Sequence, residues 1–308
     1  MECRSMGFGP RLEQTRWDES VVRDQRRGAA PKATAAEGAG DLLRLPAGDG
    51  RPECLAFVPA TFPRGGRARV ALCVHGISRD FEEQIELLRG EASRRGYALL
   101  APLFDAKGWR DYQRLGRRGR GPRADLALDR ALECLENRIE LELSDRFLIG
   151  YSGGAQFVHR YAMAHPNRVQ AVVCAAAGWY TMPDPARRYP HGLKVDGGLA
   201  GVRLDPAEFL RIPVLTVVGD SDVELESMRA SDRLDRVQGR TRIERAQRWS
   251  EAMDRAREKR GIDSRSEFIL LEGAGHAFSD CVDVGLARRA FEFFDRQGQR
   301  LGEGEVNR

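Results

Sequence analysis

The sequence lacks the apolar runs that would carry a chain into or through a membrane. No segment approaches about 18 uninterrupted apolar residues, the length that a membrane-spanning helix requires. The first thirty residues contain no apolar stretch of signal-peptide length, and they include Glu13, Asp18 and Glu19, whereas transit peptides avoid acidic residues. These absences predict a cytoplasmic protein with no membrane partner.

The cysteines lack the spacing of metal-binding and redox motifs. The six cysteines include no C-x-x-C pair, which argues against a zinc knuckle and against a thioredoxin-like redox centre. Cys54, Cys73 and Cys174 lie in apolar, strand-like runs, where a thiol behaves as a small buried hydrophobe. We therefore expect reduced thiols, no metal and no cofactor. Disulfides in an oxidising compartment are the alternative that an even number of cysteines leaves open.

The chain also has almost no surplus of one charge. Its 50 basic residues are offset by 46 interspersed acidic ones, for a net charge of +4. Nucleic-acid-binding proteins concentrate basic residues on one element or face, so we expect no nucleic-acid partner. The one local basic run lies in a glycine-rich stretch and contains Arg110, Arg114, Arg117, Arg118, Arg120 and Arg123. We interpret it as a solvated loop, with attraction of an anionic substrate or partner as the alternative.

The sequence does contain a regular alternation of apolar runs after residue 45. Residues 1–45 are polar and then rich in small residues, which predicts a mobile extension, and residues 46–308 are predicted to form one domain. Runs such as Val70-Ala71-Leu72-Cys73-Val74 are apolar at every position, as parallel strands covered on both faces are. The expected strands are Cys54–Val58, Arg69–Val74, Tyr97–Pro102, Arg146–Ile149, Gln170–Ala175, Val214–Val218 and Glu267–Leu271.

Helical patterns separate these strands. They cover Phe81–Arg95, Ala124–Ile139, Arg245–Lys259 and Val284–Gln297, and the charge density of Arg245–Lys259 predicts a surface helix. Strands that alternate with helices of this length imply an α/β fold with a doubly wound, mostly parallel sheet. The segment Trp179–Ile212 breaks the alternation with four prolines, and connections of this length usually carry function. We expect residues 179–212 to form a small lid over a pocket.

A nucleophile motif follows one of the expected strands. The run Arg146–Ile149 leads into Gly150-Tyr151-Ser152-Gly153-Gly154, which matches G-x-S-x-G between a strand and a helix. A nucleophilic serine must stand on a tight turn so that its hydroxyl projects into a cleft, and the flanking glycines leave room for that turn. The start of the next helix directs N–H groups at the reacting oxygen. We predict Ser152 as the nucleophile.

A serine hydroxyl needs a general base at neutral pH, and the five histidines are the candidates. His276 follows the last expected strand, and ligands meet open parallel sheets at the carboxyl ends of their strands. We predict His276 as the base. His75 belongs to an early turn, His159 on the helix after the serine is expected to face solvent, and His191 lies in the expected lid, where it could contact substrate.

The base needs a carboxylate that fixes its tautomer. The strand Val214–Val218 leads into Gly219-Asp220-Ser221-Asp222, where two acids compete. We favour Asp222 over Asp220, and Asp184 is a more distant alternative.

An acyl-transfer site also needs two backbone donors for its oxyanion. The turn after the serine supplies the N–H of Gly153. The turn His75-Gly76-Ile77-Ser78 supplies the second, from either Gly76 or Ile77. The candidates for substrate binding are Tyr151, Trp179, Tyr180, His191 and Phe278. Ordinary packing of the lid explains these aromatic side chains equally well.

In order and spacing, these motifs resemble the α/β-hydrolase superfamily. The match runs from about Cys54 to Gln297 and comprises His-Gly after an early strand, G-x-S-x-G, G-x-x-D and G-x-G-H-x-F. The resemblance implies an α/β-hydrolase fold with nucleophile, acid and base in the order Ser152, Asp222 and His276. Within the superfamily, the motifs are similar to the polyhydroxybutyrate depolymerase and feruloyl esterase-like branch and to dienelactone hydrolases.

Together, these residues predict a serine hydrolase that cleaves small carboxylic esters through an acyl-enzyme. A peptidase, thioesterase or acyltransferase would use the same triad, and a non-catalytic binding protein could keep the fold. The oligomeric state is left open.

Overall fold

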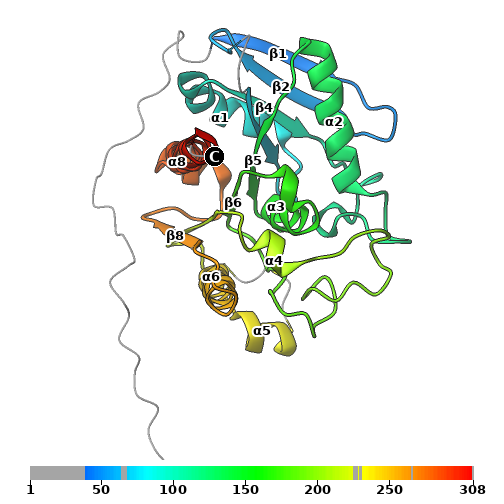
Figure 1. Cartoon of the computed structure of the whole chain (residues 1–308), viewed down its shortest axis with the longest axis vertical. Coiled ribbons are helices and arrows are strands. Elements are labelled where there is room, and N and C mark those ends of the chain that lie inside the picture. Colours follow the sequence, from blue (N-terminus) through cyan, green and yellow to red (C-terminus); the bar gives the residue numbers. More distant parts are fainter. Residues whose placement is uncertain (1–38, 64–67, 225–227, 229–230, 265, 307–308) are drawn as a thin grey trace, which may run out of the picture.

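The fold is built on one eight-stranded sheet in the order β1-β2-β4-β3-β5-β6-β7-β8 (Figure 1). The computed structural model describes residues 39–63, 68–224, 228, 231–264 and 266–306. The β1–β2 and β2–β4 pairs are antiparallel and the other pairs are parallel. The strands are β1 (Gly40–Leu45), β2 (Cys54–Pro59), β3 (Arg69–Val74), β4 (Tyr97–Pro102), β5 (Asp145–Tyr151), β6 (Ala171–Ala175), β7 (Val214–Gly219) and β8 (Ser266–Leu271).

Helices cover both faces of the sheet, so the central strands contribute side chains to two separate cores. On one face α1, α7 and α8 pack against residues such as Ala71 and Ile149. On the other face α2, α3 and α6 pack against residues such as Leu72 and Leu148. Because both faces are buried, the sequences of the central strands are continuous apolar runs. The helices are α1 (Phe81–Arg95), α2 (Ala124–Ile139), α3 (Gly153–Ala164), α4 (Pro206–Phe209), α5 (Asp232–Gln238), α6 (Arg242–Glu258), α7 (Phe278–Asp283) and α8 (Leu286–Val306).

The predicted α/β architecture with a doubly wound, mostly parallel sheet is confirmed. All the expected strands are present, and an additional one, β1, lies within the range predicted to be an extension. β1 is an edge strand whose side chains are mostly exposed, and backbone pairing with β2 places it. No alternation of buried and exposed side chains therefore marked this strand in the sequence. The ordered domain begins before residue 46, which corrects that boundary, and residues 1–38 lie outside the described residues.

Helix α6 is more deeply packed than its charge predicted. It begins three residues before the expected Arg245, at a capping box formed by Thr241 and Glu244. Its inner face buries Trp249, and even Arg245 is fully buried, with its guanidinium 2.7 Å from Asp235. The helix does lie at the surface as expected, with Arg248 and Glu251 exposed, but its charge density did not reveal that Arg245 on the inner face is buried and paired.

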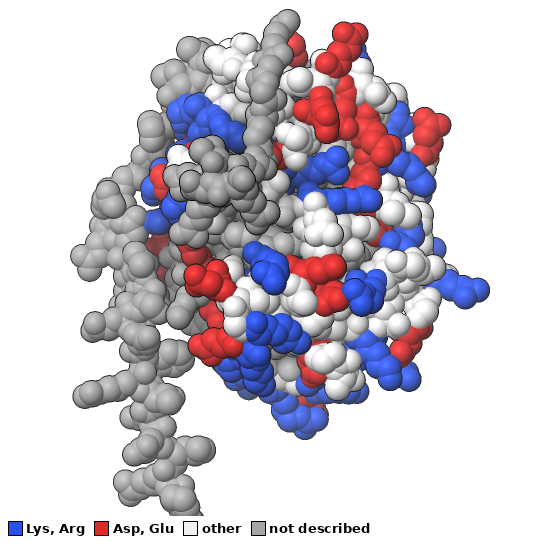
Figure 2. Space-filling model, viewed as in Figure 1, with Lys and Arg blue, Asp and Glu red and all other residues white. Residues whose placement is uncertain are grey.

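Basic and acidic side chains are interspersed over the face of the molecule shown in Figure 2. Exposed pairs also form within single helices, such as Arg255 with Glu251 on α6. Among the described residues, no helix combines the length and the apolar character needed to cross a bilayer.

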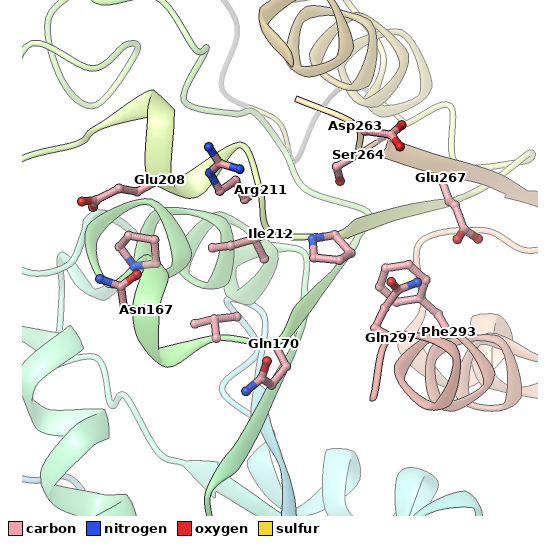
Figure 3. Close-up of a pocket in the computed structure, with 13 residues that line it drawn as sticks. Asn167, Gln170, Glu208, Arg211, Ile212, Asp263, Ser264, Glu267, Phe293 and Gln297 are labelled. Atoms are coloured by element: carbon pink, nitrogen blue, oxygen red, sulfur yellow. The ribbon is translucent and has the colours of Figure 1, made fainter. Parts of the chain in front are cut away.

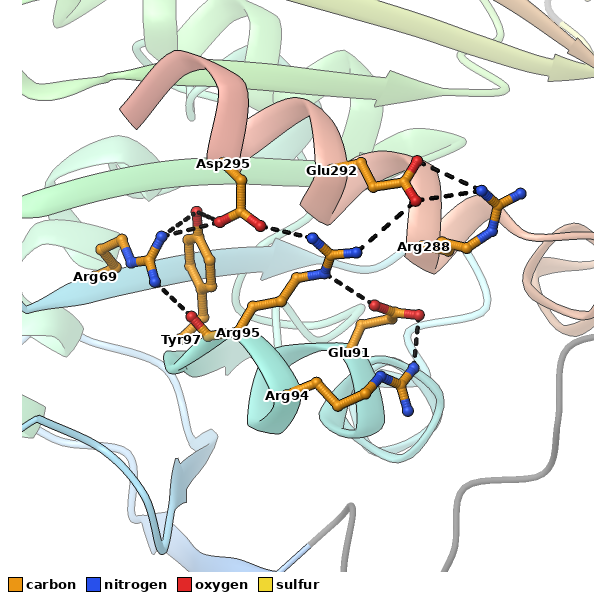
Figure 4. A network of polar contacts seen from close by, with 8 residues as sticks. All are labelled: Arg69, Glu91, Arg94, Arg95, Tyr97, Arg288, Glu292 and Asp295. Atoms are coloured by element: carbon orange, nitrogen blue, oxygen red, sulfur yellow. Dashed lines mark hydrogen bonds and ion pairs between the residues drawn. The ribbon is translucent and has the colours of Figure 1, made fainter. Parts of the chain in front are cut away.

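A polar network ties α8 to the neighbouring helix and strands (Figure 4). The carboxylate of Asp295 on α8 accepts hydrogen bonds from Arg95 on α1 at 2.6 Å and from Arg69 on β3 at 2.9 Å. Tyr97 on β4 donates to the same carboxylate at 3.1 Å. One acceptor therefore joins three elements that are distant in sequence, at the amino ends of the central strands.

We predict that Asp295→Asn lowers the free energy of unfolding by about 1–3 kcal/mol, because Arg69 and Arg95 lose the charge that they share. Urea unfolding followed by circular dichroism measures this loss. Glu292→Gln on the same helix is the control, and its more exposed carboxylate predicts a loss of about 0.5 kcal/mol or less. Equal losses would show that Asp295 has no special role in holding α8.

Candidate active site

Ser152 stands on the turn that joins β5 to α3. Its φ of 51° and ψ of −108° lie outside the regions that L-residues ordinarily occupy, and its N–H donates to the Ala175 carbonyl at 2.8 Å. A Cβ at Gly154 would lie 1.8 Å from the Val74 oxygen, and one at Gly150 would lie 2.4 Å from the Gly154 carbonyl carbon. Side chains at these two positions would therefore prevent the turn that exposes the serine.

Three predicted side chains from separate loops meet beside this turn. The Nε2 atom of His276 lies 3.2 Å from Ser152 Oγ, and its Nδ1 atom lies 2.8 Å from Asp222 Oδ2. The Asp222 carboxylate is fully buried, whereas the imidazole keeps 22% of its surface exposed. Because the carboxylate holds the proton on Nδ1, the neutral ring presents its Nε2 lone pair to the serine hydroxyl.

The other two candidate acids lie elsewhere. Asp220 accepts a hydrogen bond from the Gly273 N–H at 2.9 Å, which joins the acid loop to the base loop. Asp184 accepts from a backbone N–H two residues further on, within the segment 179–212. The structure therefore brings Asp222 to the imidazole, and not Asp220 or Asp184.

The loops that carry the acid and the base are packed directly on each other. The Ser221 N–H donates to the Ala274 carbonyl at 3.0 Å, and a Cβ at Gly219 would lie 2.2 Å from the same oxygen. These loops follow β7 and β8, which are adjacent and parallel. Their carboxyl ends therefore deliver Asp222 and His276 to the same edge of the sheet.

Arg242 is a buried cation at the site that the sequence analysis missed. Its Nη1 atom donates to Asp222 Oδ1 at 2.7 Å and to the Glu224 carbonyl at 3.2 Å, and its side chain is 2% exposed. Asp222 thus uses one oxygen for His276 and the other for Arg242. Arg242 is the first residue of α6, so the start of this helix fixes the guanidinium. No local pattern distinguishes it from the other arginines in the sequence.

A buried histidine fixes the turn after β3. His75 Nε2 accepts a hydrogen bond from the Phe104 N–H at 3.0 Å, so the neutral ring carries its proton on Nδ1 and donates it to the Gly76 carbonyl at 2.7 Å. The Tyr112 hydroxyl donates to the same carbonyl at 3.0 Å. Burial lowers the pKa of His75 to about 4, which keeps the ring neutral and the turn intact at physiological pH.

This turn also sets the direction of the next amide. The Gly76 carbonyl faces the buried His75 and Tyr112 side chains, and in a trans peptide the following N–H, that of Ile77, points the opposite way. A Cβ at Gly153 would lie 3.3 Å from the Ile77 side chain, so the two residues are neighbours. Within the described part of the chain, neither the Ile77 N–H nor the Gly153 N–H has a hydrogen-bond partner.

Two of the predicted substrate-binding residues lie beside the base. The Tyr151 ring is 5.6 Å from the His276 ring and 5.0 Å from the Phe278 ring, between ring centres. Both aromatic residues are buried, so they hold the imidazole from behind and expose little surface to a ligand.

The remaining predicted pocket residues belong to the segment 179–212. Trp179 and His191 pack against each other, with ring centres 4.7 Å apart. Tyr180 is fully buried and stacks on Trp249 of α6 at 4.6 Å. Tyr180 is therefore part of the core, which corrects the expectation that it contacts substrate.

His159 also differs from its expected position in solvent. It is 2% exposed, its Nδ1 lies 2.7 Å from the Ala155 carbonyl, and its Nε2 accepts from the Thr181 N–H at 3.0 Å. Burial lowers the pKa of His159 well below its usual value. This neutral ring anchors the segment 179–212 to α3, a role that helical periodicity alone did not reveal.

The basic loop reaches the site, although its composition predicted a solvated loop. A Cβ at Gly153 would lie 2.6 Å from Gln113 Nε2 and 2.7 Å from the Tyr112 hydroxyl oxygen. Both residues belong to the short 3-10 turn η1 (Tyr112–Arg114). The buried Asp111 just before this turn holds Arg114 and Arg117 through ion pairs. Neither Gln113 nor Tyr112 had been identified from the sequence.

A groove of about 880 Å³ lies at the opposite edge of the sheet (Figure 3). Its lining includes Gln170, Ile212 and Ser264, which precede β6, β7 and β8, together with Phe293 of α8. Ser152, by contrast, follows the carboxyl end of a central strand. The groove is therefore separate from the serine site.

Comparison with known proteins finds similar folds without similar sequences. No family model and no curated protein matches the chain. A poly(3-hydroxybutyrate) depolymerase from Bordetella parapertussis matches with a TM-score of 0.68 and 23% identity, over 84% of this chain and 90% of that one. Poly(aspartic acid) hydrolase-1 from Sphingomonas sp. KT-1 matches with a TM-score of 0.68 and 19% identity, over 82% and 97%. An S-formylglutathione hydrolase from Agrobacterium tumefaciens has a TM-score of 0.54 and 14% identity, over 81% and 93%.

We predict that His75→Asn makes the free energy of unfolding less sensitive to a fall in pH. The pKa of His75 is about 4 in the folded protein and about 6.5 when unfolded, so the unfolded chain binds more protons between these values and stability falls as pH drops through this range. Between about pH 7.5 and pH 5 this group accounts for about 2 kcal/mol of the fall.

Urea unfolding at the two pH values measures the effect, and His75→Asn is expected to remove that part of the loss. His191→Asn is the matched control, because His191 is partly exposed and should leave the loss unchanged. The same acid sensitivity in wild type and His75→Asn would contradict a buried neutral ring.

Proposed function

We propose that this chain, which has the α/β-hydrolase fold predicted from its motifs, is a serine hydrolase that cleaves carboxylic esters. The observation that carries the proposal is the continuous chain of contacts from Ser152 through His276 to Asp222. These are the contacts that convert an inert hydroxyl into a nucleophile at neutral pH.

In the acylation step, Ser152 Oγ attacks the ester carbonyl carbon while His276 Nε2 takes the hydroxyl proton. The carbonyl π electrons move to the oxygen and give a tetrahedral oxyanion. The imidazolium then donates its proton to the leaving alkoxy oxygen as the carbon–oxygen bond breaks. The products of this half-reaction are an alcohol and an acyl-enzyme.

The N–H groups of Gly153 and Ile77 are the proposed donors to the oxyanion. Their lack of other partners and their proximity to each other support this assignment, and the orientation of the Gly76 carbonyl favours Ile77 over Gly76 as the second donor. Donors fixed in advance stabilise the charge where it develops. His75 and Tyr112 act here only as positioning residues.

In the second half-reaction, water replaces the alcohol. His276 takes a proton from the water as its oxygen attacks the acyl carbon, and the proton passes to Ser152 Oγ as the acyl bond to the serine breaks. A carboxylic acid leaves, and the serine and the neutral imidazole are restored.

The similar structures support hydrolysis as the class of reaction. Those named above are a depolymerase of poly(3-hydroxybutyrate), a hydrolase of poly(aspartic acid) and a hydrolase of S-formylglutathione. The same triad would serve a peptidase, a thioesterase or an acyltransferase, and these remain the alternatives. We further propose a small-molecule substrate, covered by the segment 179–212 as a lid.

We predict that a fluorophosphonate probe labels the wild-type protein and fails to label Ser152→Ala, because only an activated serine reacts. Intact-mass spectrometry detects one adduct and peptide mapping places it. Ser78→Ala, in the turn near the site but outside the triad, should label like wild type. Equal labelling of Ser152→Ala and wild type, or none in either, would leave only the non-catalytic alternative.

Relative rates on matched ester, thioester and anilide substrates identify the class of bond that is cleaved. We expect kcat/KM for 4-nitrophenyl butyrate to exceed that for the corresponding anilide by at least about 100-fold, because 4-nitrophenolate is a much better leaving group than the 4-nitroanilide anion. A faster thioester or anilide would indicate a thioesterase or a peptidase instead.

We propose two roles for Arg242. It positions Asp222, and as a nearby cation it disfavours a second positive charge on the His276 ring. We predict that Arg242→Gln moves the ascending limb of the pH profile of kcat/KM to higher pH, because removing the buried cation beside Asp222 makes a positive charge at the site easier to form. Arg242→Lys should restore part of the profile. Arg248→Gln, on the solvent side of the same helix, is the control, and a uniform loss of rate with an unchanged profile would assign Arg242 a structural role only.

A further inference from the structure

Arg160 is a fully buried cation on α3, two helical turns after Ser152. Its Nε donates to Thr181 Oγ1 at 2.9 Å, and its Nη1 donates to the Gln113 carbonyl at 2.5 Å and to the Gln156 carbonyl at 3.0 Å. Its Nη2 atom has no hydrogen-bond partner within the described part of the chain. The guanidinium thus contacts neutral oxygens.

The other deeply buried arginines are different. Arg242 lies 2.7 Å from Asp222, Arg245 lies 2.7 Å from Asp235, and Arg257 lies 2.8 Å from a carboxylate on its own helix. No such pair is found for Arg160 among the described residues. A buried charge without a counterion destabilises the folded protein, and groups kept at such a cost are concentrated at functional sites.

The position of Arg160 relates it to the reacting serine. Helical side chains point back toward the start of their helix, which here is Ser152. Gln113 connects the two places, because its carbonyl accepts from Arg160 while its Nε2 lies 2.6 Å from where a Cβ of Gly153 would be. The Arg160 guanidinium and the start of the helix therefore lie at the two ends of the same glutamine, Gln113.

A second cation lies close to the same indole ring as the first. The Arg160 guanidinium carbon is 4.2 Å from the centre of the Trp179 ring, and that of Arg114 is 5.6 Å from the same centre. The Arg114 side chain is 20% exposed, so a ligand can reach it. Arg114 and Arg117 share the single carboxylate of Asp111. The one carboxylate of Asp111 is therefore already paired with two guanidinium groups, and neither pair includes Arg160.

We propose that Gln113, Arg114, Arg160 and Trp179 form a carboxylate subsite, and that this hydrolase prefers esters that carry a second, ionised carboxylate. Arg114 contacts that carboxylate directly, while the buried Arg160, next to the same Trp179 ring, adds positive potential to the subsite. The preferred class is a monoester of a short dicarboxylic acid, or an ester whose alcohol carries the acid. This proposal rests on the proposed function.

Two matched pairs of substrates test it. 4-Nitrophenyl hydrogen succinate against 4-nitrophenyl methyl succinate places the charge on the acyl side, and 4-carboxyphenyl acetate against its methyl ester places it on the alcohol side. We expect kcat/KM to favour the ionised member by at least about tenfold in one pair, and less so at high salt. A wild-type preference for the neutral member in both pairs, or none in either, would overturn the proposal.

Variants separate recognition from structure. Arg160→Gln and Arg114→Gln should each reduce the preference about tenfold while the neutral ester is cleaved within about threefold of the wild-type rate. Arg211→Gln, an exposed arginine at the groove of Figure 3, should change neither rate. Equal losses on both esters in Arg160→Gln and Arg114→Gln would show a structural role and overturn the proposal. If Arg160→Gln does not fold, the more exposed Arg114→Gln decides.

A failure of the proposed function would be recognised separately. In that case wild type would cleave neither member of a pair and would not react with a fluorophosphonate. The subsite would then be tested by calorimetry on Ser152→Ala, with methyl hydrogen succinate against dimethyl succinate as probes. Tighter binding of the charged probe, lost in Arg114→Gln, would support the subsite, and equal binding would reject it.

Discussion

The ion pair between Asp222 and Arg242 is the interaction on which the geometry of the site depends. A lone carboxylate as deeply buried as Asp222 would be costly, and the guanidinium 2.7 Å away offsets that cost. With its charge balanced, Asp222 can point its second oxygen at His276 and fix which ring nitrogen faces the serine. The direction of the His276 ring is thus set through a buried arginine. Because Arg242 begins α6, the site is joined directly to the packing of that helix on the sheet.

The serine side of the site is held by backbone geometry instead of charge. Gly150 and Gly154 permit a turn in which Ser152 has an unfavourable φ, and the hydrogen bond from its N–H to Ala175 on β6 helps to hold that conformation. On the other side, the neutral His75 ring locks the turn after β3. The two halves meet because the parallel strands of one sheet end at one edge.

Much of this arrangement could be predicted from the sequence, for a physical reason. Fully buried parallel strands leave continuous apolar runs, and β3 and β4 were found at their observed bounds. The turn at Ser152 was visible because its sterics demand glycines at fixed spacing. The base His276 stood out because histidine is scarce and a strand precedes it.

Most of the misses have one cause in common. Arg242, Gln113 and Tyr180 owe their positions to partners far away in sequence, and periodicity reports only neighbours along the chain. His159 was expected in solvent, yet the segment 179–212 folds over it. Edge strand β1 was missed because backbone pairing, and not burial, defines it.

Ser152 and His276 are far apart along the chain, and this separation has a consequence for partial unfolding. Ser152 follows a central strand, whereas His276 follows β8, the last strand of the sheet, whose residues are mostly only half-buried and which pairs with β7 alone. Edge strands of this kind detach at lower free energy than the centre of a sheet. A molecule that has released β8 would keep most of its core and Ser152 in place, but it would lose the contact between Ser152 and His276. Reactivity of the serine would therefore report the docking of one peripheral strand, long before any probe of the central sheet registers unfolding.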